Sequence, residues 1–126
     1  MNGVLVDTSV WVAHFREPNA ALVALLNADQ VLMHPMVLGE LACGTPPERA
    51  RTLSDLALLR QAQQASLREV IDLVDREKLH GLGCGLVDIS LLASTLLTPP
   101  ATLWTLDKRL DDLAARFKVA YSAPLH

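Results

Sequence analysis

Four carboxylates in this chain lie in or next to apolar runs: Asp7, Glu40, Asp88 and Asp107. Asp7 follows the run "VLV", and Asp107 follows "ATLWTL". Glu40 lies in "MVLGELACG" and Asp88 in "LVDISLLASTLL", and no basic residue stands within four positions of either acid. An unpaired buried charge is costly, so such acids must be paired, protonated or bound to a cation.

A divalent cation would allow these four carboxylates to share one site. If they converge without one, their mutual repulsion raises their pKa values and protonates some of them. Mg²⁺ takes oxygen ligands, keeps several waters and binds a few carboxylates together with phosphate oxygens. The bound ion polarises a phosphodiester and lowers the pKa of a water that attacks phosphorus. The four acids therefore predict a magnesium site for phosphodiester hydrolysis.

Each acid also has a structural interpretation. Asp7 and Asp107 are each placed to cap the N-terminus of a helix, which ordinarily contributes about 0.5–2 kcal/mol. Glu40 and Asp88 would be structural if a lysine or arginine from elsewhere in the fold paired with them.

Two further acids, Asp111 and Asp112, compete with Asp107 for the fourth position. The apolar residues around them, Leu110, Leu113 and Ala114, instead favour a solvated polar helix face for both.

The elements that must position these acids alternate along the chain, which predicts an α/β fold with a mostly parallel central sheet between layers of helices. Strands are expected at 3–6, at 30–34, within 99–107 and at 118–122. Helices are expected at 8–15, 19–28, 35–44 and 47–60, on the apolar spacing Leu67, Val70, Ile71 and Val74, at 86–97, and around Leu110 to Phe117. Parallel strand ends meet near a topological switch point, where ligands bind, so Asp7 and Asp107 are expected there.

The composition fits one domain over residues 1–126 with a real core, because 51% of the residues are hydrophobic and mean hydropathy is +0.28. Charge or proline interrupts every long apolar stretch, and the N-terminus lacks a basic region and a cleavage site. We therefore expect a cytoplasmic protein with no membrane segment. A net charge of −3 excludes a strongly basic grip on nucleic acid. Cys43 and Cys84 are expected as small buried core residues in a reducing compartment.

The segments "VLVDTSVW", "VLGELACG", "GLGCGLVDISLLAS" and "LWTLDKRL" together resemble the four acidic motifs of PIN-domain ribonucleases, in the same order. The resemblance spans essentially the whole chain and is greatest to the VapC-type toxins of prokaryotic type II toxin–antitoxin modules. It implies a three-layer α/β/α PIN-like fold and Mg²⁺-dependent endonucleolytic cleavage of RNA, with Mn²⁺ as a substitute ion.

The resemblance also implies a role for each acid. Asp7 and Asp88 would bind the metal directly, Glu40 would bind it or position water, and Asp107 would bind it or orient the attacking water. Three hydroxyl residues would hold these carboxylates by hydrogen bonds: Thr8, Ser9 and Thr105.

The expected partners are RNA and a cognate antitoxin whose C-terminal segment fills the toxin groove. Phosphate contacts are expected from Arg16, Lys108 and Arg109, whose alternative is an ordinary surface role. The helices at 19–28 and 35–44 carry more apolar residues than one small core needs. An antitoxin, and a second copy of the chain in a homodimer, would cover them.

Two other functions compete with this interpretation. A catalytically inactive module could keep the fold to bind a partner, although the presence of all four acids argues against it. A phosphotransferase could use Asp7 as a nucleophile, but the second aspartate that this chemistry needs two residues later is replaced by Ser9.

Overall fold

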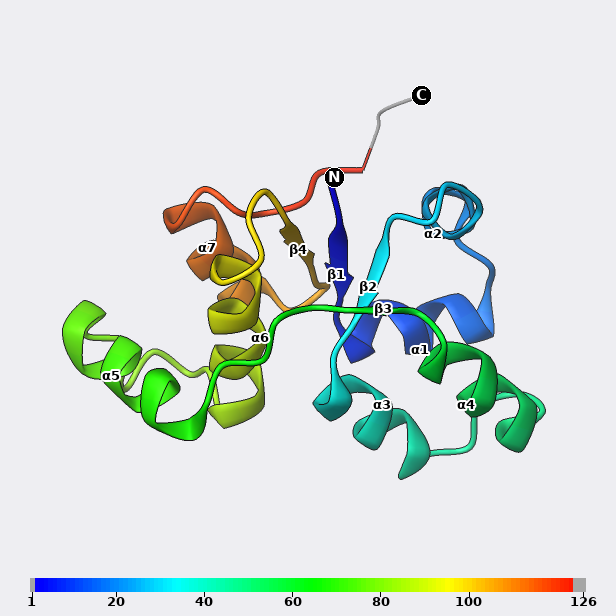
Figure 1. Cartoon of the computed structure of the whole chain (residues 1–126), viewed down its shortest axis with the longest axis horizontal. Helices are drawn as coiled ribbons and strands as arrows, with labels where there is room; N and C mark the ends of the chain where they lie inside the picture. Colours follow the sequence, from blue (N-terminus) through cyan, green and yellow to red (C-terminus); the bar gives the residue numbers. More distant parts are fainter. Residues whose placement is uncertain (1, 124–126) are drawn as a thin grey trace.

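The computed structural model describes residues 2–123 and contains a four-stranded sheet whose strand pairs are all parallel. The strands are β1 (Val4–Val6), β2 (Val31–Met33), β3 (Arg60–Gln61) and β4 (Thr102–Trp104), in the spatial order β3-β2-β1-β4 (Figure 1). The order reverses between β1 and β4, so the topological switch point lies between these two strands. The strands that precede Asp7 and Asp107 are therefore neighbours at that point.

Helices cover both faces of the sheet. They are α1 (Thr8–Arg16), α2 (Ala20–Asn27), α3 (Pro35–Ala42), α4 (Arg49–Ala57), α5 (Leu67–Glu77), α6 (Leu86–Leu96) and α7 (Lys108–Arg116). Helices α5, α6 and α7 lie on one side of the sheet, and α1 to α4 lie on the other (Figure 1). The expected three-layer α/β/α fold is thus confirmed.

The core explains why α6 carries apolar residues on almost every side. Its residues from Ile89 to Thr95 are all buried, because α5 and α7 both pack against it and it also contacts β4. Thr95 satisfies its hydroxyl inside the helix by donating to the Leu91 carbonyl at 2.8 Å. Trp11 and Trp104 belong to the same core.

Two predicted element boundaries are wrong. The helix expected at 47–60 ends at Ala57, and Arg60–Gln61 instead forms the short edge strand β3 beside β2. The strand expected at 118–122 is a single parallel bridge between Leu103 and Ala120. A two-residue strand is too short to produce the alternating pattern from which strands are recognised, and the apolar residues of 118–122 pair with Leu103 at one position only.

The predicted apolar face of α5 is also wrong in part. Val70 is buried and Val74 is half-buried, but Leu67 and Ile71 are 60% and 47% exposed, while Leu73 is buried in their place. The packing of α5 against α6 determines which side of α5 is buried. That buried side is narrower than the apolar face predicted from the sequence.

The cysteines depart from expectation as well. Cys43, expected in the core, is exposed because it caps the C-terminal end of α3 beyond that helix's buried residues. Cys84 is half-buried, and both thiols are free. No helix among residues 2–123 has the length and apolar character needed to cross a membrane.

His34, at the end of β2, connects the sheet to α3. It is buried, and its Nδ1 accepts a hydrogen bond from the Met36 N–H at 3.0 Å, which caps the helix. Burial lowers the pKa of His34 from 6.5. The folded protein therefore resists protonation of this ring, and a protonated Nδ1 could no longer accept the capping bond.

We therefore expect stability to be fully present above about pH 6.5, the pKa in the unfolded chain, and to fall as the pH drops below it. The measurement is urea unfolding across this range, with His34→Asn as the control, because asparagine also caps helices but does not titrate. Identical pH dependence in the two proteins would contradict this role for His34.

Candidate active site

Asp7 ends β1 and is only 7% exposed. It stands at the N-cap position of α1, yet its side chain makes no capping hydrogen bond. Instead, Oδ2 accepts hydrogen bonds from the Ser9 hydroxyl at 2.7 Å and from the Thr105 hydroxyl at 2.8 Å. Helix capping therefore does not explain this carboxylate, and within residues 2–123 its Oδ1 makes no hydrogen bond.

Both hydroxyls that hold Asp7 are themselves fixed by backbone groups. The Leu106 N–H donates to Ser9 Oγ at 3.0 Å, and the Asp107 N–H donates to Thr105 Oγ1 at 3.0 Å. Each hydroxyl accepts one bond and is left to donate its proton to Asp7. The loop after β4 is in this way tied to the carboxylate at the end of β1.

Glu40 lies on α3, and its Oε1 accepts a hydrogen bond from the Thr8 hydroxyl at 2.6 Å. Thr8 is the first residue of α1, so this bond holds Glu40 next to the segment that carries Asp7. The expected apolar surroundings of Glu40 are wrong: the side chain is exposed. Helix α3 buries Val37 and Leu41, and Glu40 falls on its open side.

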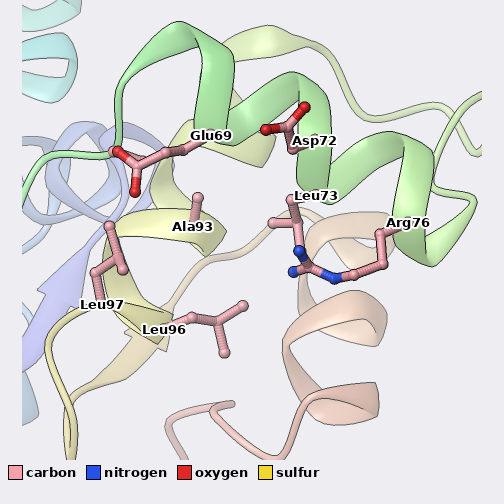
Figure 2. A pocket seen from close by; sticks show the side chains of 8 residues that line it. Glu69, Asp72, Leu73, Arg76, Ala93, Leu96 and Leu97 are labelled. Carbon is pink, nitrogen blue, oxygen red and sulfur yellow. The ribbon is translucent and has the colours of Figure 1, made fainter.

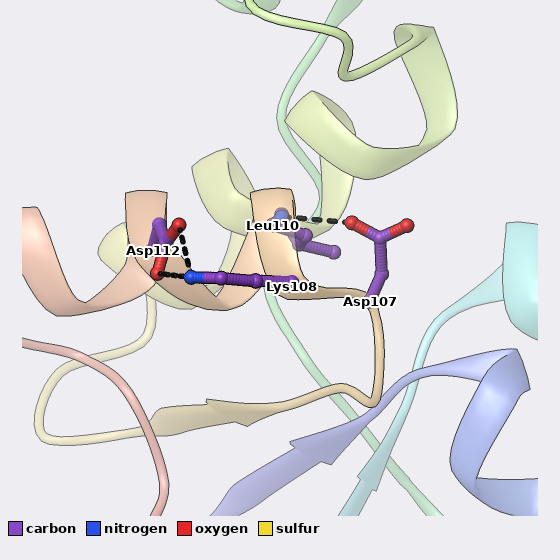
Figure 3. A network of polar contacts seen from close by, with 4 residues as sticks. All are labelled: Asp107, Lys108, Leu110 and Asp112. Carbon is purple, nitrogen blue, oxygen red and sulfur yellow. Dashed lines mark hydrogen bonds and ion pairs between the residues drawn. The ribbon is translucent and has the colours of Figure 1, made fainter.

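Asp107 is exposed and does cap α7, because its Oδ1 accepts from the Leu110 N–H at 2.9 Å (Figure 3). The capping interpretation is therefore confirmed for Asp107, which leaves Oδ2 available for a second partner. Asp111 and Asp112 are both exposed, as expected for a solvated helix face.

Asp88 is half-buried in the first turn of α6, and its Oδ2 accepts a long hydrogen bond of 3.4 Å from the Gly85 N–H. Burial raises the pKa of Asp88 above its usual value, the Gly85 bond opposes this, and the charges of Asp7, Asp107 and Glu40 raise it further. The charges of the other three acids thus reach Asp88, although the four residues come from separate segments.

This concentration of negative charge has no basic partner in the described part of the chain. None of the ion pairs between residues 2 and 123 includes any of the four acids. The structural alternative, a lysine or arginine paired with Glu40 or Asp88, is therefore not found there. A bound cation would balance the cluster, and protonation of Asp88, whose pKa is raised, is the alternative.

The donor atoms fit a hard divalent ion. Each is a carboxylate oxygen, the ligand that Mg²⁺ prefers, and no histidine or thiolate set suited to zinc stands among them. Across residues 2–123, no group of three histidine, cysteine, aspartate or glutamate side chains is close enough together to enclose a metal ion. Mg²⁺ keeps several of its waters, so carboxylates can hold it without all touching it.

The three basic residues expected at phosphate differ in their surroundings. Lys108 turns along α7 to Asp112, with its Nζ 3.2 Å from Oδ2, and points away from Asp107 (Figure 3). Arg16 lines a pocket of about 360 Å³ between α1, α3 and the following loop, and Glu40 lines the same pocket. Arg109 extends from α7 toward the loop before α6.

Another cavity, of about 270 Å³, lies between α5 and α6 and contains none of the predicted site residues (Figure 2). Its charged side chains already have partners: Glu69 accepts from the Ser66 N–H, Asp72 pairs with Arg68, and Arg76 pairs with Glu77. The acid cluster at the switch point is therefore the better candidate for chemistry.

Comparison with known proteins identifies the family of this chain. The family model "PIN domain" matches residues 4–116, a range that includes all four acids. Ribonuclease VapC32 of Mycobacterium tuberculosis, from strains CDC 1551 / Oshkosh and ATCC 25618 / H37Rv, is 46% identical to this chain over 117 residues. The match covers 93% of this chain and 94% of each relative. The resemblance inferred from the four motifs is thus confirmed, and the chain belongs to the PIN-domain family.

Proposed function

We propose that this chain is a metal-dependent endoribonuclease and the toxin of a type II toxin–antitoxin module. The observation that carries the proposal is that the charges of Asp7, Asp107 and Glu40 all act on Asp88, while no ion pair between residues 2 and 123 includes any of the four acids. The identity to a protein named ribonuclease VapC32 supports the same activity. We also propose that it acts in the cytoplasm as one domain over residues 1–126.

In this proposal the acids hold Mg²⁺, or Mn²⁺ in its place. Asp7 and Asp88 would hold the ion. Glu40, which the Thr8 hydroxyl orients, would hold it or position water, and Asp107 would hold it or orient the attacking water. A bound divalent ion would supply a lowered pKa for water and polarisation of the phosphodiester.

The reaction leaves a distinctive pair of product ends. Water adds to phosphorus while the bond to the 3′ oxygen breaks, so the products carry a 5′-phosphate and a 3′-hydroxyl. The test is to cut a labelled single-stranded RNA with the purified chain in Mg²⁺ and to identify both ends. A 2′,3′-cyclic phosphate would instead show attack by the RNA's own 2′-hydroxyl and would contradict this mechanism.

Thr105→Val should weaken this activity without removing the fold. Valine keeps the shape of threonine but leaves Asp7 with one hydrogen bond fewer, and loss of such support commonly reduces activity or metal affinity about 10–100-fold. The part-buried Asp107 N–H also loses its acceptor on Thr105, at about 0.5–1.5 kcal/mol of stability. Cleavage rates measured over a range of Mg²⁺ concentrations should reveal the change.

The matched control is Thr102→Val on strand β4, which precedes Thr105, because the Thr102 hydroxyl makes no hydrogen bond within residues 2–123. Its cleavage rate should equal that of the parent. If Thr105→Val also cleaved RNA at the parent rate, the proposed support of Asp7 by Thr105 would be wrong.

We further propose that a cognate antitoxin, and a second toxin chain in a homodimer, cover apolar surface. Val23 on α2 and Met36 on α3 are 40% and 38% exposed, on the two helices whose apolar content motivates this proposal. Light scattering of the purified chain at high concentration tests the homodimer. A monomer that binds no dye for apolar surfaces would contradict both partners.

A further inference from the structure

The Arg109 side chain occupies the space that a side chain at Gly83 would need. Gly83 lies in the loop before α6 with φ of +85°, and a Cβ atom placed on it would lie 2.5 Å from Arg109 Nη1, 2.7 Å from Cδ and 2.9 Å from Cζ. The Arg109 side chain therefore lies directly against the bare backbone of Gly83. Any larger residue at position 83 would displace the guanidinium, which is the flexible partner of the contact.

The charges of Arg109, Asp88 and Asp107 all act on the thiol of Cys84. Burial raises the pKa of the Cys84 thiol, Asp88 and Asp107 raise it further, and Arg109 lowers it. Arg109 has no ion-pair partner between residues 2 and 123, whereas its neighbour Lys108 is paired with Asp112. Arg109 is thus a cation near Asp88 and Asp107 that no ion pair within residues 2–123 occupies.

We propose that Arg109 binds an RNA phosphate at the acid cluster, and that Gly83 is the positioning residue that holds its guanidinium there. This inference rests on the proposed ribonuclease function and deepens it. A cluster of acids repels the phosphates of its own substrate, and a fixed cation beside it offsets that repulsion. The planar guanidinium can also donate two parallel hydrogen bonds to one phosphate, which a lysine cannot do.

The glycine pair in the loop provides a matched test. Gly81 also has a positive φ, +73°, but a Cβ atom there would meet nothing within 4 Å. Gly83→Ala and Gly81→Ala therefore impose similar backbone strain, and only the first pushes against Arg109. The remaining variants are Arg109→Gln, Arg109→Lys and the double variant Gly83→Ala/Arg109→Gln.

Two quantities are measured for each variant on a short fluorescein-labelled single-stranded RNA. The first is kcat/KM for cleavage in Mg²⁺, and the second is the salt dependence of RNA binding in EDTA, which keeps the RNA intact. Thermal unfolding establishes that each variant is folded. The exposed position of Arg109 on α7 makes its substitutions suitable for this comparison.

We expect Arg109→Gln to lower kcat/KM by roughly 10- to 100-fold, as for the loss of a charge-assisted contact. The slope of log binding constant against log salt should become shallower by about 0.7, the value for one phosphate contact to a single strand. Gly83→Ala should change both quantities in the same direction, and Arg109→Lys should keep most of the salt slope but lose cleavage. The double variant should be no worse than Arg109→Gln, and Gly81→Ala should match the parent.

The opposite results separate this inference from the function on which it rests. If the parent cleaves RNA in Mg²⁺ but Arg109→Gln keeps its kcat/KM and salt slope, Arg109 does not bind phosphate and the inference alone fails. If Gly83→Ala and Arg109→Gln have additive effects, or if Gly81→Ala is equally impaired, Gly83 does not act through Arg109. If the parent neither binds nor cleaves RNA, the proposed function fails and this inference with it.

Discussion

Replacement of Asp7 by asparagine should reduce Mg²⁺-dependent RNA cleavage by about a thousandfold or more. Groups that only support a metal ligand contribute roughly 10–100-fold, and one preorganised polar group at a reacting centre contributes about 100–1,000-fold. Asp7 is expected to exceed the first range because it is the most buried of the four acids and two hydroxyls orient its carboxylate. Single-turnover cleavage rates with saturating enzyme measure this loss without interference from product release.

Asp111→Asn is the matched control for this variant. It removes the same charge from a nearby but solvated position on α7, so its cleavage rate should stay at the parent level. A loss of activity in Asp111→Asn comparable to that of Asp7→Asn would mean that overall charge, rather than a specific ligand, controls the rate.

Mg²⁺ should stabilise the parent protein but not Asp88→Asn. An ion that binds only the folded state adds about 2.7 kcal/mol to the free energy of unfolding at a hundred times its dissociation constant. Asp88→Asn removes a proposed ligand, so most of this gain should disappear. Urea unfolding with Mg²⁺ and with EDTA measures the gain in each protein.

The same variant makes a second prediction in EDTA. The raised pKa of Asp88 means that the folded protein holds this proton more tightly than the unfolded chain does. The free energy of unfolding therefore falls as pH rises from the pKa of Asp88 in the unfolded chain to its higher pKa in the folded protein. At neutral pH the ionised carboxylate is unfavourable in the folded state. Asp88→Asn should be at least as stable as the parent without metal. A less stable variant would indicate that Asp88 has a structural role.

The central strands and α6 could be predicted because their sequences are determined by burial. A run such as "VLV" is buried on both faces of a parallel sheet, and α6 is surrounded by other elements, so both are apolar throughout. Strand β3 could not be predicted, since its two residues pair only at the sheet edge and nothing local distinguishes them from the end of a helix.

The four acids of the candidate site remain a prediction. The chain order of the acids indicated which ones to expect near one another, and the hydrogen bonds of Thr8, Ser9 and Thr105 agree with the expected support of carboxylates. The exposure of Glu40 could not be predicted, because the orientation of a short apolar helix depends on what packs against it. The role that we infer for Gly83 had only one signal, the glycine-rich segment 81–85.

The most direct test of the central claim is RNA cleavage by the parent, Asp7→Asn and Asp88→Asn, each with Mg²⁺, Mn²⁺ and EDTA. The proposed metal centre predicts that the parent cleaves with either ion, that EDTA abolishes cleavage, and that both variants are inactive although folded. Cleavage by the parent that persists in EDTA, or in both variants, would contradict a metal site built from these acids. If the parent binds metal without cutting several RNAs in the absence of antitoxin, the chain is instead a PIN-fold binding module.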